Sequence, residues 1–337
     1  MMGVLIVIPC LNEEQHLPQL LDMLLRENTG ASVIVADGGS TDASRAIVSR
    51  LSAIHSNLTL LDNPARLQSA GINLAVRRYS AGHEWLVRID AHCDYPPDYV
   101  SGLLKAARQH QASSVVVPMV THANGCFQKA AATAQNSFLG NGGSAHRRIV
   151  EGQFVDHGHH ALIDLALFRE IGGYDESFSH NEDAEFDLRL GAAGGRIWLE
   201  PSLALGYWPR SAPGALFRQY QGYGRGRAMT LTRHDVAIKP RQAAPVMVAP
   251  LVLLGLVGFC IAPIQPLTAI LILPTITWSL LCLGFGFSLG IKQRCLCAAV
   301  AGPAAMVMHF AWSFGFISQK LFGPRPGRPP RAIEVPA

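Results

Sequence analysis

The residues with the clearest chemical potential lie in RIDAHCDYPPDY, residues 88–99, where Asp90, His92 and Asp94 alternate along the chain. In an extended chain, alternate side chains face the same way, so these three side chains can converge. Carboxylate oxygens suit Mg²⁺, and an added imidazole nitrogen moves the preference toward Mn²⁺. We therefore predict a divalent metal site, for Mn²⁺ or Mg²⁺, built on Asp90 and His92. The choice between His92 and Asp94 as the second ligand stays open.

A second acidic stretch, NEDAEFDLRL, places Glu182 and Asp183 at the start of a helix that is predicted over residues 182–192, with Asn181 as its cap. A carboxylate at a helix N-terminus is well held and readily ionised. Such a group can take part in proton transfer, so Glu182 and Asp183 are candidate catalytic residues. The alternative is that both side chains only complement the helix dipole.

The first 100 residues carry a pattern that can position these side chains. Apolar runs at residues 4–8, 32–36, 58–61 and 85–89 alternate with helical patterns at residues 17–24, 42–51 and 67–79. This alternation predicts an α/β fold with a mostly parallel central sheet. Ligands of such sheets bind beyond the carboxyl ends of the strands, and Asn12, Asp37 and Asp90 follow three of those ends.

In residues 115–180 the alternation of apolar runs and helical patterns is less regular. A strand is expected at residues 114–119. The segment GNGGSAHRRIVEGQFVDHGHH, residues 140–160, is rich in glycine, histidine and arginine, and we expect a long functional loop or lid there. Its histidines form no convincing zinc pair, whereas Arg147 or Arg148 could neutralise an anionic lipid diphosphate or simply face solvent.

The composition of the chain changes after residue 241. The whole chain is 49% hydrophobic and only 15% charged, whereas soluble domains carry about 25% charged residues. Residues 246–262, 267–291 and 296–317 are apolar runs that could each span about 30 Å of hydrocarbon as a helix. We predict a catalytic region over residues 1–240, a membrane region of two or three transmembrane or re-entrant helices over residues 241–320, and a basic, proline-rich, disordered tail over residues 321–337.

The basic residues around the apolar runs leave the number of crossings open. Lys239 and Arg241 precede the first run, and Lys292 and Arg294 follow the second, so two crossings keep both pairs inside, as the positive-inside rule prefers. A third crossing would place the arginines of the tail outside. Either the third run is re-entrant or interfacial, or one of the first two does not cross.

Charge, cysteine content and the N-terminus narrow the class of protein further. A net charge of +4 does not suggest a nucleic-acid binder. The seven cysteines include no C-x-x-C pair, so packed thiols are expected in place of a disulfide framework or a zinc ribbon. The start, MMGVLIVIP, is too short for a signal peptide. We expect a multi-pass protein of the cell inner membrane with its catalytic region in the cytoplasm.

Four motifs, in this order, resemble those of the inverting glycosyltransferases of family 2. They are VIPCLNEEQHL, ADGGSTDAS, RIDAHCDYPPDY and NEDAEFDLRL, and the resemblance covers roughly residues 3–230. It implies a GT-A fold and a nucleotide-sugar donor. The D-A-H triplet, the GNGGSAHRR loop and the apolar C-terminal part together look most like the ExoA-type glucosyltransferases of succinoglycan biosynthesis.

The resemblance also implies a donor-nucleotide site at the ends of the strands. The residues that it assigns to this site are Pro9, Asn12, Glu13, Asp37, Gly38 and Asp90, with Arg225 as a further contact to the diphosphate. In the family, the aspartate at the position of Asp37 accepts a hydrogen bond from N3–H of uracil. Arg225 has an alternative role, which is contact with anionic lipid at the membrane surface.

The same resemblance implies the catalytic residues. The family usually has D-x-D where this chain has Asp90-Ala91-His92, and its base is the aspartate of the E-D pair, which is Asp183 here. Processive members carry Q-x-x-R-W. In this chain Gln221 and Arg225 are one residue too far apart, and glycine replaces the tryptophan, which argues against a processive polymer synthase.

The sequence therefore predicts a membrane-associated hexosyltransferase. The resemblance implies that it would transfer one glucose from UDP-glucose, in β-linkage, to a lipid-linked saccharide during exopolysaccharide biosynthesis. One alternative is transfer to polyprenyl phosphate itself, whose phosphate oxygen needs no general base. Another is a catalytically silent membrane protein that only binds partners or nucleotide.

Overall fold

A computed structural model describes residues 3–27, 30–141, 151–238, 240–324, 327 and 329–334. The chain forms two compact units, and each is described by itself. The first unit comprises Met1–Val120, Arg148–Tyr207 and Arg328–Ala337, and the second comprises Thr121–Arg147 and Trp208–Gly327. The predicted boundary of the catalytic region at residue 240 stays a prediction, because compactness does not say which segments take part in catalysis.

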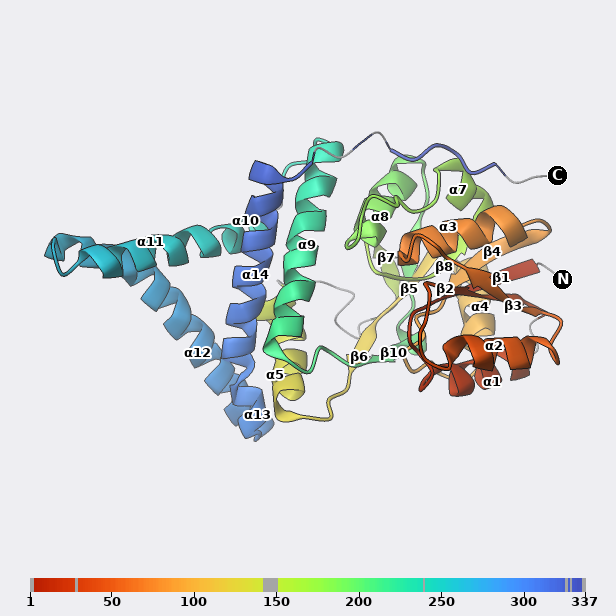
Figure 1. Cartoon of the computed structure of the whole chain (residues 1–337), viewed down its shortest axis with the longest axis horizontal. Coiled ribbons are helices and arrows are strands. Elements are labelled where there is room, and N and C mark those ends of the chain that lie inside the picture. Colours follow the sequence, from red (N-terminus) through yellow and green to blue (C-terminus); the bar gives the residue numbers. More distant parts are fainter. Residues whose placement is uncertain are drawn as a thin grey trace. The chain divides into compact units, whose positions relative to one another are not determined.

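The first unit is built on an eight-stranded sheet with the order β3-β2-β1-β4-β8-β5-β9-β7 (Figure 1). Its strands are β1 (Gly3–Cys10), β2 (Ser32–Asp37), β3 (Leu58–Asp62), β4 (His83–Arg88), β5 (Ser114–Val117), β7 (Gln153–Val155), β8 (His159–Asp164) and β9 (Ile197–Leu199). Strands β1 to β4 pair in parallel, and β5 pairs with β9 in parallel. The predicted α/β fold with a mostly parallel sheet is confirmed. A separate short pair joins β6 (Met119–Thr121) to β10 (Leu205–Tyr207).

Helices cover both faces of this sheet, because successive strand residues point to opposite sides. In β1, Val4, Ile6 and Ile8 pack in one core cluster with α1, α2 and α4, whereas Leu5 and Val7 pack in a second cluster with α3, α7 and α8. The helices are α1 (Leu17–Arg26), α2 (Ser44–Ser52), α3 (Gln68–Tyr79), α4 (Tyr99–His110), α7 (Leu165–Glu170) and α8 (Glu182–Ala192), with the 3₁₀ helix η2 (Pro201–Leu203). An apolar run buried on both faces is typical of a parallel sheet.

The largest departure from the sequence prediction lies in β8. This strand begins in the last two residues of the segment that was predicted to be a long loop or lid, and it is inserted antiparallel between β4 and β5. Ala161, Leu162 and Ile163 are fully buried there, so hydrophobic burial accounts for the strand. The loop prediction, which covered residues 140–160, is wrong for residues 140–141, 153–155 and 159–160, and residues 142–150, including Arg147 and Arg148, lie outside the described residues.

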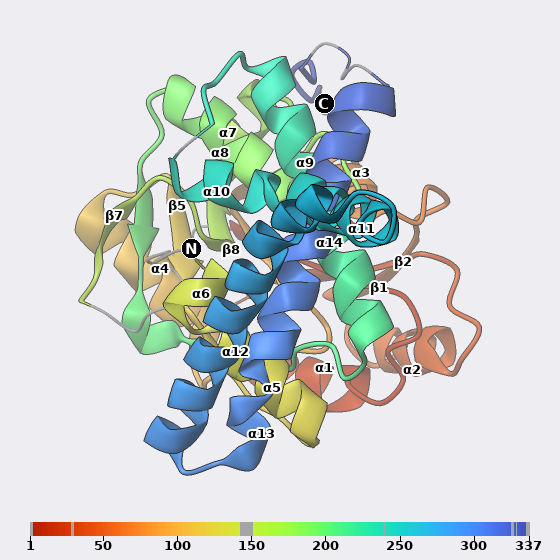
Figure 2. The ribbon, with the colours of Figure 1, turned by 90° about the vertical axis from the view of Figure 1, so that its left-hand side faces the viewer.

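The second unit is helical. It contains α5 (Cys126–Gln135), α6 (Phe138–Asn141), α9 (Pro213–Arg233), α10 (Pro240–Val246), α11 (Val248–Ile261), η3 (Pro266–Ile272), α12 (Leu273–Gln293), α13 (Leu296–Ala299) and α14 (Ala301–Phe322). Helix α14 lies against α5, α9 and α12 (Figure 2). Three stretches in the described residues are long and apolar enough to cross a membrane: Gln242–Ile261, Pro266–Gln293 and Leu296–Phe322. They match the three predicted apolar runs.

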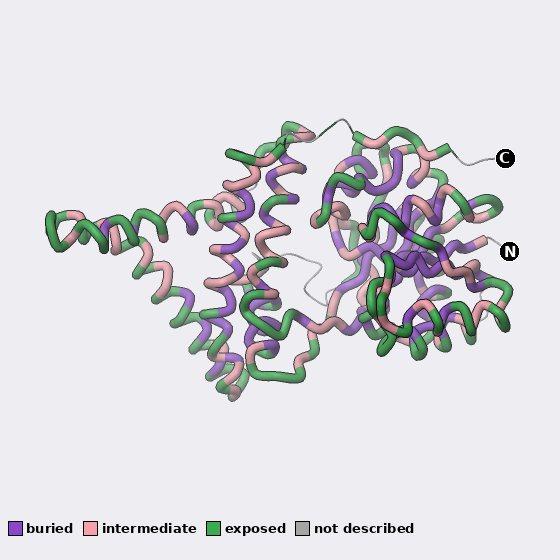
Figure 3. Tube along the Cα trace, in the orientation of Figure 1, coloured by how far each residue is buried: buried purple, intermediate pink, exposed green. Residues whose placement is uncertain are grey.

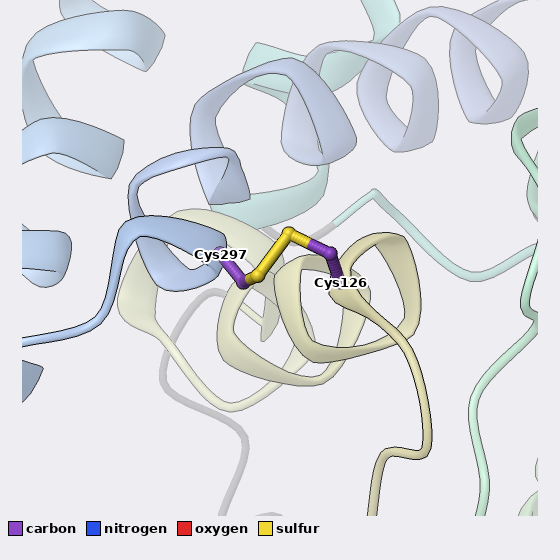
Figure 4. Close-up of a disulfide and its surroundings, with 2 residues drawn as sticks. All are labelled: Cys126 and Cys297. Carbon is purple, nitrogen blue, oxygen red and sulfur yellow. A yellow bond between two sulfur atoms is a disulfide. The ribbon is translucent and has the colours of Figure 1, made fainter.

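A disulfide joins Cys126 at the start of α5 to Cys297 in α13 (Figure 4). The prediction that every cysteine is a packed thiol is therefore wrong for these two residues. It is also wrong for Cys260, which is exposed on α11. The spacing of 171 residues between the bonded cysteines gives no sequence signal, because only tertiary packing of α5 beside α13 brings them together.

The end of the chain packs on the first unit. The backbone N–H of Ile333 donates to the carbonyl oxygen of Arg169 at 2.8 Å, and the Ile333 side chain packs on the core cluster that contains Phe168. The predicted disorder of the tail is wrong for residues 329–334. A single isoleucine among prolines and charges carries this contact, which a composition-based prediction does not detect.

Candidate active site

A pocket of about 190 Å³ lies at the carboxyl ends of β1, β2 and β4 in the first unit. Its lining includes Pro9, Glu13, Gly38, Asp90 and His92, which are five of the residues predicted to bind the donor or the metal. Asn12 and Asp37 are not among the lining residues. The structure thus brings together side chains from three strand ends, as the strand-end argument predicts.

The loops after β1 and β2 hold each other through hydrogen bonds. The Asn12 side-chain oxygen accepts from the backbone N–H of Thr41 at 2.8 Å, and the backbone N–H of Asn12 donates to Ser40 Oγ at 2.9 Å. The backbone N–H of Glu13 donates to Ser44 Oγ at 2.8 Å. Asn12 is thus a loop-to-loop tie, and the helix that follows begins at Leu17, so it does not cap that helix.

Asp37 is buried at the end of β2 and is fully engaged by its own loop. Its carboxylate accepts from the backbone N–H groups of Gly39 and Ser40, from Ser40 Oγ and from Arg45 Nη1 at 2.7 Å. Burial alone would raise the pKa of Asp37, but the hydrogen bonds from Ser40 and Arg45 outweigh it and lower the pKa. In this arrangement Asp37 shapes the β2–α2 loop, and a direct contact to uracil stays a prediction.

Sequence reasoning missed three polar lining residues in the β3–α3 segment, which are Asn63, Arg66 and Gln68. Arg66 has a left-handed backbone with φ of 57°, and Gly39, with φ of 90°, packs against its guanidinium. Asn63 is buried, and its side-chain oxygen has no hydrogen-bond partner among the described residues. The available signal was that β3 is also a parallel strand, so its carboxyl end belongs to the same edge.

Asp90 stands beside a buried cation. Arg88 Nε lies 3.3 Å from Asp90 Oδ1, Gln68 Nε2 donates to the same oxygen at 2.8 Å, and His159 Nε2 lies 3.6 Å from Oδ2. Burial would raise the pKa of Asp90, but the charges of Arg88 and the nearby imidazoles lower it to about 2. Burial also lowers the pKa of His159 to about 4, against the opposing pull of Asp90. Asp90 is therefore an ionised carboxylate at neutral pH.

The extended-strand geometry from which the convergence of Asp90, His92 and Asp94 was predicted is wrong, although Asp90 and His92 line the same pocket. The chain turns at residues 91–93, with the Cys93 N–H directed to the Asp90 carbonyl oxygen, so the alternation of an extended strand does not apply. His92 Nδ1 instead lies 3.0 Å from Glu13 Oε1. No group of three His, Cys, Asp or Glu side chains that could hold a metal occurs among the described residues. Asp90 still fits a magnesium-type site, which needs only one or two protein carboxylates beside substrate phosphates.

Glu182 and Asp183 occupy the first turn of α8, whose bounds match the predicted residues 182–192. Arg88 Nη1 lies 3.5 Å from Glu182 Oε1, so this guanidinium lies between Glu182 and Asp90. Burial and the charge of Asp183 raise the pKa of Glu182. Burial opposes ionisation of Asp183 too, but His157, His160 and Arg88 lower its pKa. Asn181 stands at the cap position, yet its side chain makes no cap hydrogen bond, so that part of the prediction is wrong.

A buried histidine–aspartate cluster lies one helical turn beyond Asp183 and was also missed. His157 Nδ1 lies 2.6 Å from Asp187 Oδ2, and His160 Nε2 lies 2.7 Å from Asp187 Oδ1. The other nitrogen of His160 contacts the hydroxyl of Tyr174 at 2.5 Å. Both histidines belong to the segment around β8, whose insertion beside β4 could not be read from the sequence. The cluster places polar, titratable groups close to Asp183.

The remaining predicted donor contact, Arg225, lies on α9 in the second unit. Its role at the diphosphate therefore stays a prediction. His92, whose Nδ1 lies 3.0 Å from Glu13 Oε1, likewise stays a predicted metal ligand.

The fold and this arrangement of acidic groups define a nucleotide-sugar transferase of the GT-A type. The family model "Glycosyl transferase family 2" matches residues 5–172. The chain is 48% identical over 314 residues to the "Succinoglycan biosynthesis protein ExoA" of Rhizobium meliloti (strain 1021), covering 93% of each protein. The chain belongs to glycosyltransferase family 2 and is a glycosyltransferase of the ExoA type.

More distant relatives share the fold. The chain is 21% identical over 241 residues to a "dolichyl N-acetyl-alpha-D-glucosaminyl phosphate 3-beta-D-2,3-diacetamido-2,3-dideoxy-beta-D-glucuronosyltransferase" of Methanococcus voltae, covering 68% of this chain and 74% of that protein. The solved structure "Mannosyltransferase PcManGT from Pyrobaculum calidifontis in complex with GDP-Man and Mn2+" superposes with a TM-score of 0.60. It is 18% identical, and the match covers 94% of this chain and 87% of that chain. This last likeness shows the fold alone.

Proposed function

We propose that this protein transfers one glucose from UDP-glucose, with inversion to a β-linkage, to a lipid-linked saccharide in exopolysaccharide assembly. The observation that carries the proposal is Arg88, which contacts both Asp90 at the pocket and Glu182 beside Asp183. It ties the donor pocket to the predicted base in one buried charge network. The name of the 48% identical relative supports succinoglycan as the product class.

The pocket supplies the donor site in this proposal. Pro9, Glu13 and Gly38 line it from the loops after β1 and β2, and Arg66 adds a guanidinium that suits a phosphate oxygen. Asp90, ionised and at the edge of the pocket, is the residue that would hold a divalent cation. A bound Mg²⁺ or Mn²⁺ would neutralise the charge that develops on the departing diphosphate. The Mn²⁺ in the mannosyltransferase structure supports a metal-dependent reaction.

The acceptor site lies at the start of α8 in this proposal. Asp183 is held at the helix N-terminus, where its lowered pKa keeps it ionised and able to accept a proton from the acceptor hydroxyl. Burial raises the pKa of Glu182, so Glu182 is ionised less readily than Asp183. In this proposal Glu182 shapes the acceptor site beside the base. One proton acceptor on the face opposite the leaving group is what a single displacement with inversion needs.

The membrane holds the lipid part of the acceptor in this proposal. The three long apolar helices support a multi-pass protein of the cell inner membrane with the catalytic unit in the cytoplasm, where nucleotide sugars are made. The positive-inside preference of the basic residues near these helices points the same way.

Transfer to a lipid extract tests the proposal. Membranes that contain the wild-type chain, or Asp183→Asn, receive Mn²⁺, labelled UDP-glucose and lipids that carry diphosphate-linked sugars, and label is counted in the organic phase. We expect label with the wild type and little with Asp183→Asn. Equal label in both would favour the polyprenyl-phosphate acceptor, which needs no base. No release of UDP, GDP or dTDP from a panel of donors would support a silent binding protein.

A further inference from the structure

The three long apolar helices of the second unit differ in how much of their surface is covered. Within the most apolar window of each helix, 22% of the residues are buried for Gln242–Ile261 and 11% for Pro266–Gln293, but 44% for Leu296–Phe322. Figure 3 shows α11 and α12 as largely exposed or intermediate, with more buried positions along α14. Most of the exposed residues of α11 and α12 are large and apolar, for example Leu253, Phe259 and Leu280. A helix that is apolar all round suits lipid.

Helix α14 is covered by a polar helix over much of its length. A Cβ added at Gly224 of α9 would overlap the Trp312 carbonyl oxygen, and one added at Gly315 of α14 would overlap the carbonyl oxygen of Gln221. Near the ends of both helices, Lys320 Nζ donates to Thr232 Oγ1 at 2.7 Å. The two helices therefore run side by side in the same direction (Figure 1).

The composition of α9 makes a joint crossing costly. It carries the four arginines Arg218, Arg225, Arg227 and Arg233. If α14 crossed the bilayer, α9 would have to enter it as well, at a cost of about 2.5–3.5 kcal/mol for each arginine near the centre. The glycines at the contact between α9 and α14 do not indicate a membrane location, because small residues allow close helix packing in water as well as in lipid.

The residues just before α14 and the residues just after it are both connected to segments that lead to the first unit. Just before α14, Cys297 is bonded to Cys126, which follows β6 after a few residues. After Phe322, the chain reaches Ile333, which is hydrogen-bonded to Arg169 of the first unit. The few residues between Phe322 and Ile333 are rich in proline and too short for a second spanning helix, which needs about 17 residues or more. A non-helical chain cannot cross hydrocarbon with its backbone groups unpaired.

We propose that the chain enters the bilayer as one hairpin, formed by α10–α11 and η3–α12, that crosses twice, whereas α14 does not cross. The hairpin has its turn, residues 262–265, on the side opposite the catalytic unit. Its first arm, Gln242–Ile261, has 20 residues, which corresponds to about 30 Å of helix. Lipid hydrocarbon covers α11 and α12, and α14 lies with α9 at the interface on the catalytic side. Lys292, Arg294 and the tail arginines then all stay on one side, as the positive-inside rule prefers.

This inference rests on the membrane location in the proposed function but not on its sugar chemistry. The test uses the full chain with Cys260→Ser, which removes the exposed cysteine, and one new cysteine at a time. The positions are Gln265→Cys in the hairpin turn, Lys292→Cys after α12 and Gly327→Cys after α14. An added Cβ at Gly327 meets no atom within 4 Å, and Gln265 and Lys292 are exposed. Retained glycosyl transfer, or retained thermal stability if no donor is found, shows that each variant folds.

A membrane-impermeant maleimide is applied to right-side-out and inside-out vesicles, and labelling is read by peptide mass spectrometry. We expect Gln265→Cys to label at least about tenfold faster from outside, and Lys292→Cys and Gly327→Cys to label at least about tenfold faster from inside. Labelling of Gly327→Cys from the same side as Gln265→Cys would show that α14 crosses and overturn the proposal. So would labelling of all three from one side, labelling of Gln265→Cys only after detergent, or extraction of the chain as a detergent-free oligomer.

Discussion

The two acidic ends of the site differ in where their partners come from. At the donor end, Asp90 is held by Gln68 and Arg88, which belong to the neighbouring βα units of the parallel half of the sheet. At the base end, Asp183 and Asp187 on α8 meet His157 and His160 from the antiparallel insertion. The first set follows from a repeating pattern of strands and helices, whereas the second depends on one strand that breaks this pattern.

The comparison teaches that neighbouring charges, and not burial alone, set the pKa values of the acidic groups at both ends. Asp90 and Asp183 both have lowered pKa values, because cations and imidazoles outweigh burial, whereas burial and a neighbouring anion raise the pKa of Glu182. Arg88 is the common element, since it contacts Asp90 and Glu182. We therefore expect Arg88 to matter for the fold and the two aspartates for the chemistry.

The largest effect is expected at the base. Asp183→Asn removes the proton acceptor but keeps the shape of the side chain, so kcat should fall by roughly 10²–10⁴-fold with little change in the donor KM. The matched control is Asp164→Asn, because Asp164 caps α7 and asparagine caps about as well. Steady-state release of UDP measures both variants. Similar kcat values for the two variants would remove Asp183 from the mechanism.

The next effect separates fold from chemistry. Arg88→Met leaves Asp90 and Glu182 buried without their cation, so the free energy of unfolding should fall by about 3–5 kcal/mol. Arg77→Met breaks an exposed ion pair with Glu176 and should cost no more than about 1 kcal/mol. Denaturant unfolding followed by tryptophan fluorescence compares the two. Equal losses would mean that the buried network adds nothing beyond a surface pair.

The pH dependence of stability sharpens the donor end. Asp90 has a folded pKa of about 2 against an unfolded value of about 3.9, so its stabilising contribution is complete above about pH 4 and is lost as pH falls through about 2. The contribution is on the order of 2–3 kcal/mol. In thermal melts between pH 6 and pH 2, the melting temperature should therefore fall less with decreasing pH for Asp90→Asn than for the wild type. Parallel curves would contradict the lowered pKa.

A smaller effect is expected at His92. If its imidazole reaches the metal once the donor binds, the ratio of rates with Mn²⁺ and Mg²⁺ should be above one in the wild type and fall by up to about tenfold in His92→Gln. His16→Gln is the control, because His16 contacts the other oxygen of the Glu13 carboxylate, Oε2, and is not among the residues that line the pocket. Equal rates with both metals in the wild type would remove the nitrogen-ligand argument.

The smallest effect is expected in the ties between the loops after β1 and β2. Ser40→Ala removes the hydroxyl that donates to Asp37 and accepts from the Asn12 N–H, so stability should fall by about 1 kcal/mol. The donor KM should rise more than kcat falls, because these loops line the pocket. Ser52→Ala, whose hydroxyl only contacts a carbonyl oxygen within α2, should leave both unchanged.

The same contrast explains how far the sequence could be read. Alternating apolar and helical segments predicted β1 to β4, α1 to α3 and the pocket at their ends, because each strand and helix has a local periodic signal. The bounds of α8 were also readable. The turn at residues 91–93 could not be read from the sequence. Strand β4 ends at Arg88, and the turn that follows it breaks the alternation of side chains that was expected for an extended chain.

Other features needed tertiary structure. The insertion of β8, the disulfide between Cys126 and Cys297 and the docking of Ile333 all join segments that are far apart in the chain. A histidine-rich stretch carries no periodicity, so nothing local shows that His160 is buried against Asp187. Partners such as these are chosen by packing, which a single sequence does not display.

The central claim is a single displacement in which Asp183 accepts the proton of a lipid-linked acceptor. The most direct measurement is the anomeric configuration of the newly formed bond, determined by NMR on the product released from the lipid after transfer from UDP-α-glucose. The account predicts a β-linked glucose, produced by the wild type and strongly reduced in Asp183→Asn. An α-linked product would show retention and would contradict the single displacement.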